Sequence, residues 1–311
     1  MISHSRRSWL QLSAAGLAVP GLLRGASSGR RIPNPISHGT YGLPGYSLTG
    51  AIQLIAETGF DSIEIAAMPG YHGAPDQVSK KERGAIRARL KDSQLELGAL
   101  MGLPTPNSAR QAANTVVVEQ MLELASDLAP DKAPLIQGVL GGGNWNDKQA
   151  LFRDCLGPWV DLASQAGVKL AIKPHRGHAM SLPQHAIWLI EQLDAAGKLT
   201  MVYDHSHFAF RDLPVRETVE TALPHTSYLV MKDAVLRDGD VRFALPGTCE
   251  TIPHAAILRQ FMEGSYHGDI CSEVSSQVWK AEGYDAVKAT ETCFANLQRI
   301  ADEAAQERSR P

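Results

Sequence analysis

The chain has 311 residues, of which 44% are hydrophobic and 20% are charged, and its formal net charge is -3 at pH 7. This length is enough for one large domain or two smaller domains with a sizeable core. The slightly negative charge gives no electrostatic basis for binding a nucleic acid, and we expect no nucleic-acid partner. The four cysteines show neither a CxxC pair nor a zinc-type spacing, so we expect buried apolar side chains rather than a disulfide framework.

The N-terminus carries a twin arginine, Arg6-Arg7, followed by the modestly apolar segment LSAAGLAVPGLL. This segment is too short to span a bilayer as a stable helix, so no integral membrane domain is expected. Residues 1–28 resemble a twin-arginine export signal, which predicts a periplasmic or otherwise exported protein. The alternative is an amphipathic tail on a cytoplasmic protein.

From residue 32 to residue 306, apolar runs of strand length alternate with helical patterns. The predicted strands are Pro35–Tyr41, Ser62–Ala66, Leu95–Leu103, Leu135–Leu140, Lys169–Ile172, Thr200–Tyr203, Ser227–Met231 and Asp269–Val274. The predicted helices are Ser47–Gly59, Ser79–Ser93, Ala109–Leu128, Asp147–Gly167, Pro183–Gly197, Pro214–Leu223, Pro253–Gly264 and Tyr284–Ala305.

Eight strands that alternate with eight helices predict a parallel sheet with right-handed crossovers. This α/β pattern fits a single closed (β/α)8 barrel, the TIM barrel. An open, doubly wound sheet is the alternative, but the sequence after the first strand, GTYGLPGYS, lacks the GxGxxG order of a phosphate-binding turn. The barrel is therefore the favoured architecture.

In such a barrel the active site lies at the carboxyl ends of the strands. Residues able to carry charge lie at or near the ends of several predicted strands: Glu64, Lys173, His175, Asp204, His207, Lys232 and Glu273. Arg176 and His178 add to the positive segment KPHRGH after the fifth strand. We therefore expect these residues to gather at one rim of the barrel.

Three of them are candidate ligands of a divalent metal. Asp204 and His207, in the stretch DHSH, are spaced so that an oxygen and an imidazole can bind one ion. The alternative is a capping aspartate beside a surface histidine. Glu273 follows a buried strand, where an ionised carboxylate is costly without a partner. Its alternative is a structural ion pair with Lys232.

The motifs YDHSHFAF, LVMKDA and DICSEV, in this order, resemble the xylose-isomerase-like barrel superfamily from about residue 35 to residue 303. This superfamily includes sugar-phosphate isomerases and epimerases, ketose 3-epimerases, inosose dehydratases and endonuclease IV-type enzymes. The resemblance implies a small sugar or sugar derivative as the partner, and an oligomer is compatible with it. The endonuclease branch is the least favoured, because the chain is acidic overall.

The resemblance also implies a divalent cation, Mn²⁺, Mg²⁺, Co²⁺ or Zn²⁺, held by two glutamates, an aspartate and a histidine. Carried over to this chain, Asp204 and Glu273 match two of these ligands, and His207 matches a further histidine that contacts substrate or metal. The other two ligand positions are Lys173 and Val230, where the family has glutamate and histidine. The implied metal site therefore departs from the family pattern.

These observations predict a sugar isomerase, an epimerase or a related lyase that abstracts a proton next to a carbonyl. Its catalytic residues are expected to be Glu273, Lys173 and His207. Lys173 would polarise the carbonyl or, if burial lowers its pKa, form a Schiff base. The expected substrate-binding residues are His175, Arg176, Lys232 and Glu64. The alternative is a carbohydrate-binding barrel with a relict active site.

Overall fold

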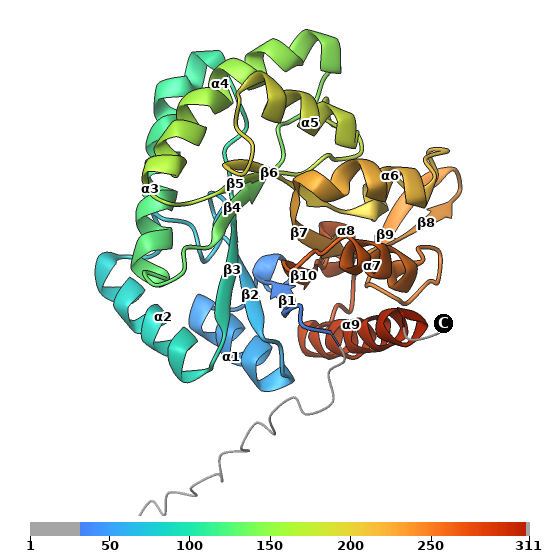
Figure 1. Cartoon of the computed structure of the whole chain (residues 1–311). Helices are drawn as coiled ribbons and strands as arrows, with labels where there is room; N and C mark the ends of the chain where they lie inside the picture. The colour runs from blue at the N-terminus through green and yellow to red at the C-terminus, as the bar shows by residue number, and fades with distance from the viewer. Residues whose placement is uncertain (1–31, 309–311) are drawn as a thin grey trace, which may run out of the picture.

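The computed structural model of the chain describes residues 32–308. Eight parallel strands form a closed barrel in the order β1-β10-β7-β6-β5-β4-β3-β2 (Figure 1). These strands are β1 Ile36–Gly39, β2 Ser62–Ala66, β3 Glu96–Met101, β4 Leu135–Gly138, β5 Leu170–Ile172, β6 Leu199–Tyr203, β7 Thr226–Met231 and β10 Asp269–Ser272. The prediction of a single (β/α)8 barrel is confirmed, and the open sheet is excluded because β1 pairs with β10.

Helices surround the barrel and cover its outer face (Figure 1). They are α1 Leu48–Thr58, α2 Lys80–Asp92, α3 Gln111–Leu128, α4 Trp145–Gln165, α5 Pro183–Gln192, α6 Val215–Ala222, α7 His254–Glu263, α8 Ser276–Trp279 and α9 Ala286–Arg308. Short 3-10 turns are η1 Thr40–Gly42, η2 Ser108–Arg110, η3 His205–His207 and η4 Leu223–His225. All eight predicted helices are present, although the fifth ends at Gln192 rather than at Gly197.

Local sequence explains why two of these helices begin and end where they do. Ser79 and Glu82 form a capping box at the start of α2, each side chain accepting a hydrogen bond from the backbone of the other. Helix α1 ends at Gly59, whose φ of 112° is favourable only for glycine. A Cβ atom at Gly59 would also lie 2.9 Å from the Phe294 ring, so glycine is required for packing against α9.

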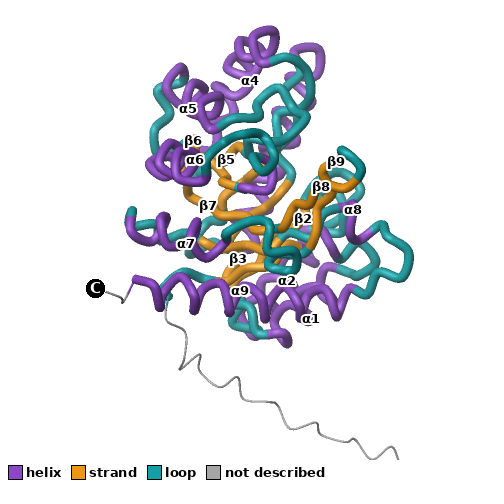
Figure 2. The backbone as a smooth tube through the Cα atoms, turned by 90° about the vertical axis from the view of Figure 1, so that its right-hand side faces the viewer, coloured by secondary structure: helices purple, strands orange, loops and turns teal. Residues whose placement is uncertain are grey.

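One supersecondary element was not predicted. Strands β8 Asp233–Arg237 and β9 Asp240–Ala244 form an antiparallel hairpin between β7 and α7, separate from the barrel sheet (Figure 2). Its turn residues, Asp238 and Gly239, have φ angles of 52° and 83°. This hairpin begins directly after the end of β7 and therefore lies next to the expected active site.

Buried apolar side chains form two groups. The larger one fills the layer between the barrel and its helices. The smaller one fills the inside of the barrel and consists of Ala99, Ala171, Val202, Tyr228, Val230 and Cys271. Polar side chains within the strands also meet inside the barrel, as Glu64 of β2 and Gln137 of β4 do at 2.9 Å.

Two further predictions concern the cysteines and the membrane. Cys155, Cys271 and Cys293 are buried and unpaired, as predicted, whereas Cys249 is unpaired but only half-buried. Within residues 32–308 no helix has the length and apolar character needed to cross a bilayer. The predicted export segment, residues 1–28, lies outside the described residues.

Candidate active site

Charged side chains from four strand ends meet at the carboxyl rim of the barrel. Lys173 follows β5, Asp204 follows β6, Lys232 follows β7 and Glu273 follows β10. All four are buried, and their exposed fractions are 3% for Lys173, 0% for Asp204, 1% for Lys232 and 8% for Glu273. The parallel arrangement of the strands thus gathers two lysines and two carboxylates that are far apart in the sequence.

Lys232 lies at the centre of this group. Its Nζ atom donates a hydrogen bond to Asp204 Oδ2 and another to Glu273 Oε1 at 2.7 Å. The same Nζ atom lies 3.3 Å from His207 Nε2 and 5.0 Å from the centroid of the Phe243 ring. The ion pair with Glu273, considered from the sequence as the structural alternative, is therefore present.

Lys173 forms the second pair. Its Nζ atom donates to Glu273 Oε2 at 2.5 Å and lies 3.8 Å from Asp204 Oδ2. Glu273 therefore binds one lysine with each of its carboxylate oxygens. Asp204 binds Lys232 through Oδ2 and accepts hydrogen bonds from the backbone N–H and the hydroxyl of Ser206 through Oδ1.

Burial and these ion pairs act on the pKa values in opposite directions. Burial alone would raise the pKa of Glu273, but attraction to Lys173 and Lys232 outweighs it and lowers that pKa. The pKa of Asp204 is lowered for the same reason, with Lys232 as its main partner. Both carboxylates are therefore ionised at neutral pH.

The pKa of Lys173 is shifted upward by the same ion pairs. Burial would lower its pKa, but the negative charges of Glu273, Asp204 and Glu64 outweigh burial and raise it. A Schiff base requires a neutral amine at Lys173. The Schiff-base hypothesis required burial to lower the pKa of Lys173, but this pKa is raised. Lys173 is therefore an ammonium ion.

The histidines beside this cluster are neutral. Burial and the nearby Lys232 lower the pKa of His207 to about 4. The pKa of His175 is lowered as well, mainly by burial and then by His207 and the lysines. The His175 and His207 rings lie with their centroids 3.8 Å apart, and His178 follows 4.3 Å from His175.

Glu64 is a further buried carboxyl group, on β2. Its Oε2 atom accepts a hydrogen bond of 2.9 Å from Gln137 of β4, whereas its buried Oε1 atom has no hydrogen-bond partner. Burial raises the pKa of Glu64 to about 7, although attraction to Lys173 and the bond from Gln137 oppose this. Near neutral pH, Glu64 is therefore poised between its acid and its base form.

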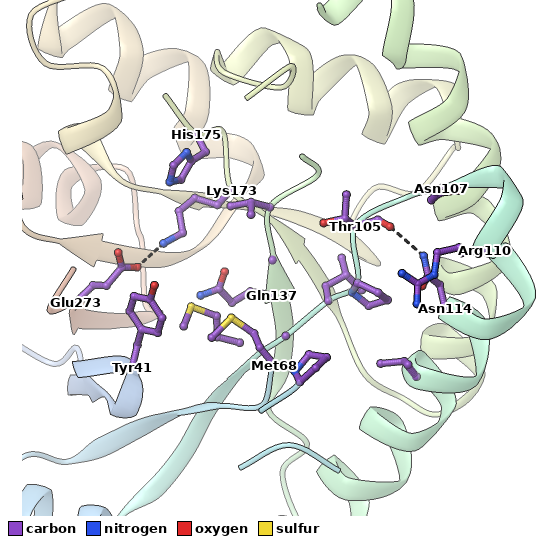
Figure 3. A pocket seen from close by; sticks show the side chains of 18 residues that line it. Tyr41, Met68, Thr105, Asn107, Arg110, Asn114, Gln137, Lys173, His175 and Glu273 are labelled. Atoms are coloured by element: carbon purple, nitrogen blue, oxygen red, sulfur yellow. Dashed lines mark hydrogen bonds and ion pairs between the residues drawn. The ribbon is translucent and has the colours of Figure 1, made fainter. Parts of the chain in front are cut away.

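A cavity of about 540 Å³ opens beside the charged cluster (Figure 3). Lys173, His175 and Glu273 line it together with Tyr41 and Gln137. Its far end is formed by α3 and the chain before it and includes Arg110 and Asn114. Lysine and carboxylate thus form one wall of a space large enough for a small molecule.

The remaining predicted substrate-binding residues do not line this space. Arg176 donates a hydrogen bond to the backbone carbonyl of Ala209, and neither Arg176, Lys232 nor Glu64 is among the residues that line the cavity. Gln137, which does line it, was not singled out from the sequence. A polar residue within the buried apolar strand Leu135–Gly138 is the signal that indicates its inward position.

The donor set does not fit a divalent metal while both lysines are charged. The three candidate ligands, Asp204, His207 and Glu273, surround the Lys232 ammonium group. Among residues 32–308 there is no group of three or more His, Cys, Asp or Glu side chains placed to hold a metal ion. A metal ion would have to displace Lys232 or lie beside two ammonium groups.

Comparison with known proteins gives the family. Residues 52–293 match the family model described as xylose isomerase-like TIM barrel, and the chain belongs to this family. No curated protein matches the chain.

Solved structures share the fold at low sequence identity. The IolI protein with a bound zinc atom has a TM-score of 0.74 and 16% identity, covering 87% of this chain and 99% of that one. D-psicose 3-epimerase in the presence of D-fructose has a TM-score of 0.72 and 16% identity, with the same coverage of 87% and 99%. The apo form of 3-keto-D-glucoside 4-epimerase, YcjR, from E. coli has a TM-score of 0.68 and 14% identity, covering 86% and 99%.

Proposed function

We propose that the chain is a sugar isomerase or epimerase that moves a proton at a carbon next to the carbonyl of a sugar or keto-sugar. The observation that carries this proposal is the Lys173–Glu273 pair, 2.5 Å long, in the wall of the cavity. Membership of the xylose isomerase-like family, and two similar structures named as sugar epimerases, support the same reaction class.

In this proposal Lys173 binds the carbonyl oxygen of the substrate. The ammonium group then donates a hydrogen bond to that oxygen in place of Glu273, and it stabilises the negative charge that develops there. Losing one of its two lysine partners raises the pKa of Glu273, because ion pairing is what lowers it. Substrate binding would therefore turn Glu273 from a weak base into a stronger one.

Glu273 next takes the proton from the neighbouring carbon. The C–H electron pair forms the C=C bond of an enol or enolate, and the carbonyl π electrons move to the oxygen held by Lys173. Return of a proton to the opposite face of the same carbon gives an epimer. Return to the former carbonyl carbon gives an isomer, when the hydroxyl proton of the neighbouring carbon also passes to the oxygen held by Lys173. No step is assigned to a divalent cation, because Lys232 lies among its candidate ligands.

Return of a proton to the opposite face needs a second proton carrier. Glu64 is assigned to this role, because it is close to half-protonated at neutral pH and accepts a hydrogen bond from Gln137, which lines the cavity. His207 does not line the cavity and would act through Asp204, which it contacts at 3.3 Å. His175, on the cavity wall, would contact a sugar hydroxyl group. Lys232 and Arg176 would then act indirectly, by holding the carboxylates and the loop around Ala209.

Deuterium exchange tests the reaction. We expect the wild-type protein in D₂O to place deuterium next to the carbonyl of D-fructose, D-psicose or a 3-keto-D-glucoside, observed by NMR. Glu273→Gln should lower the exchange rate by at least about a hundredfold, because it removes the base. Exposed Glu282 provides the control variant Glu282→Gln, which should exchange at the wild-type rate. Sugar binding without any exchange would instead support a carbohydrate-binding barrel with a relict site.

The N-terminal segment carries a second part of the proposal. Arg6-Arg7 and the apolar stretch that follows support export through a twin-arginine pathway, so the substrate would be met outside the cytoplasm.

A further inference from the structure

The Lys232 side chain is surrounded as a bound cation would be. An ammonium group has three N–H donors, and Lys232 Nζ has three acceptors within reach: Asp204 Oδ2, Glu273 Oε1 at 2.7 Å and His207 Nε2 at 3.3 Å. The contact with His207 requires the tautomer in which Nε2 carries no proton. Two of these three acceptors come from carboxylates and one from imidazole, the donor types that bind divalent metals.

The charges of the cluster also balance without a metal. Asp204 and Glu273 supply two negative charges, and Lys173 and Lys232 supply two positive charges, as one divalent cation would. A divalent metal ion added to this arrangement would bring two more positive charges. Four positive charges, two from the metal and two from the lysines, would then lie beside two buried carboxylates. Coulomb repulsion in such surroundings is strong and only weakly screened by salt.

The two lysines differ in their access to the cavity. Lys232 is buried between the carboxylates and His207 and does not line the cavity, whereas Lys173 does. Phe243 of the β8–β9 hairpin further covers Lys232. Lys232 is thus placed to hold the carboxylates, and Lys173 is placed to meet a ligand.

We infer that the Lys232 ammonium group replaces the divalent metal at this strand-end site, so that the protein binds no divalent cation there. Lys232 holds Asp204 and Glu273 in position, and Lys173 is the cation presented to a ligand. The role of Lys173 as the cation that meets a ligand rests on the proposed function. The replacement of the metal by Lys232 is inferred from the contacts of Lys232 with Asp204, Glu273 and His207, and it does not depend on the proposed function.

Metal binding is the test, and it is independent of turnover. The full-length protein, purified without chelator, should contain well below one equivalent of Mn²⁺, Co²⁺, Zn²⁺ or Mg²⁺ by elemental analysis. Its thermal unfolding midpoint should not change with EDTA, because a chelator shifts the midpoint only of a protein that binds metal. About one equivalent of a chelatable divalent metal, lost in Asp204→Ala, would overturn the inference.

Removing the ammonium group should create a metal site. In Lys232→Met the donors Asp204, His207 and Glu273 are left without their cation, and we expect Zn²⁺ to bind at least about tenfold more tightly than to the wild type, by calorimetry. The matched control is Lys198→Met, an exposed lysine just before β6, which should leave Zn²⁺ binding unchanged.

A second variant covers the case in which Lys232→Met does not fold. Lys232→Gln removes the positive charge but keeps a polar side chain beside Asp204, Glu273 and His207. We expect it to gain Zn²⁺ affinity as well. If neither Lys232 variant gained affinity over the wild type, Lys232 would not be what excludes the metal, and the inference would be wrong. Loss of sugar exchange in these variants would bear on the proposed function alone.

Discussion

Two glutamates at the rim of this barrel have pKa values shifted in opposite directions by their surroundings. Glu273 is paired with two lysines, and its pKa is lowered. Within the described residues Glu64 has no ion-pair partner, and its Oε1 atom has no hydrogen-bond partner, so burial raises its pKa to about 7. Pairs of carboxyl groups separated in this way are typical of sites where one group is a base and another carries a proton.

The raised pKa of Glu64 predicts a pH-dependent stability. Between its ordinary pKa of 4.5 and about 7, folded Glu64 keeps a proton that the unfolded chain has lost, so stability falls as pH rises through this window. Glu64→Gln, which cannot ionise and can still accept the hydrogen bond from Gln137, should escape this loss. Its free energy of unfolding relative to wild type should rise by about 3 kcal/mol between pH 4.5 and pH 8.

Urea denaturation at several pH values measures this difference. The charged groups that act on Glu64, namely Lys173, Lys232 and Glu273, are present in both proteins, and so is His207. Their own titrations therefore cancel in the comparison. A constant difference between the two proteins across this pH range would show that Glu64 is ionised in the folded state.

At the scale of the elements, the β8–β9 hairpin was missed because its pattern is weak. Leu236 is 55% exposed, so the hairpin does not show the buried apolar run by which the barrel strands were found. The signal that identifies it is the Asp238-Gly239 pair, since two successive residues with positive φ form the tight turn of a two-residue hairpin. The hairpin matters for the site because β9 carries Phe243 over Lys232 and His207.

Phe243→Ala should therefore weaken the ion cluster. The Phe243 ring has its centroid 5.0 Å from Lys232 Nζ and 5.2 Å from the centroid of the His207 ring. Losing this cation–π contact and the buried ring area should lower the free energy of unfolding by about 2 kcal/mol. Arg242→Ala, the neighbouring exposed position with a surface ion pair to Asp240, should cost less than about 1 kcal/mol. Equal losses in the two variants, by urea denaturation, would count against a covering role for Phe243.

At the scale of the whole molecule, the barrel could be predicted because its strands are buried on both faces and read as continuous apolar runs. Their alternation with helices fixes the order around the barrel, so strand ends as distant as Lys173 and Glu273 could be placed at one rim. The sequence could not show which side chains each of the two lysines contacts. Lys173 and Lys232 both follow strands, and only the structure shows that Lys232 lies among Asp204, His207 and Glu273 while Lys173 lines the cavity.

The described barrel is also suited to the proposed export. Its four cysteines are unpaired, and three are buried, so the fold needs no oxidising compartment to form disulfides. This agrees with a twin-arginine signal, whose pathway exports proteins that have already folded. In a bacterium with this pathway we expect the full-length chain in the periplasmic fraction, whereas Arg6→Lys with Arg7→Lys should keep it in the cytoplasm. Arg30→Lys with Arg31→Lys, which keeps the first arginine pair, should be exported as the wild type is. A wild-type chain found only in the cytoplasm would favour an N-terminal tail over an export signal.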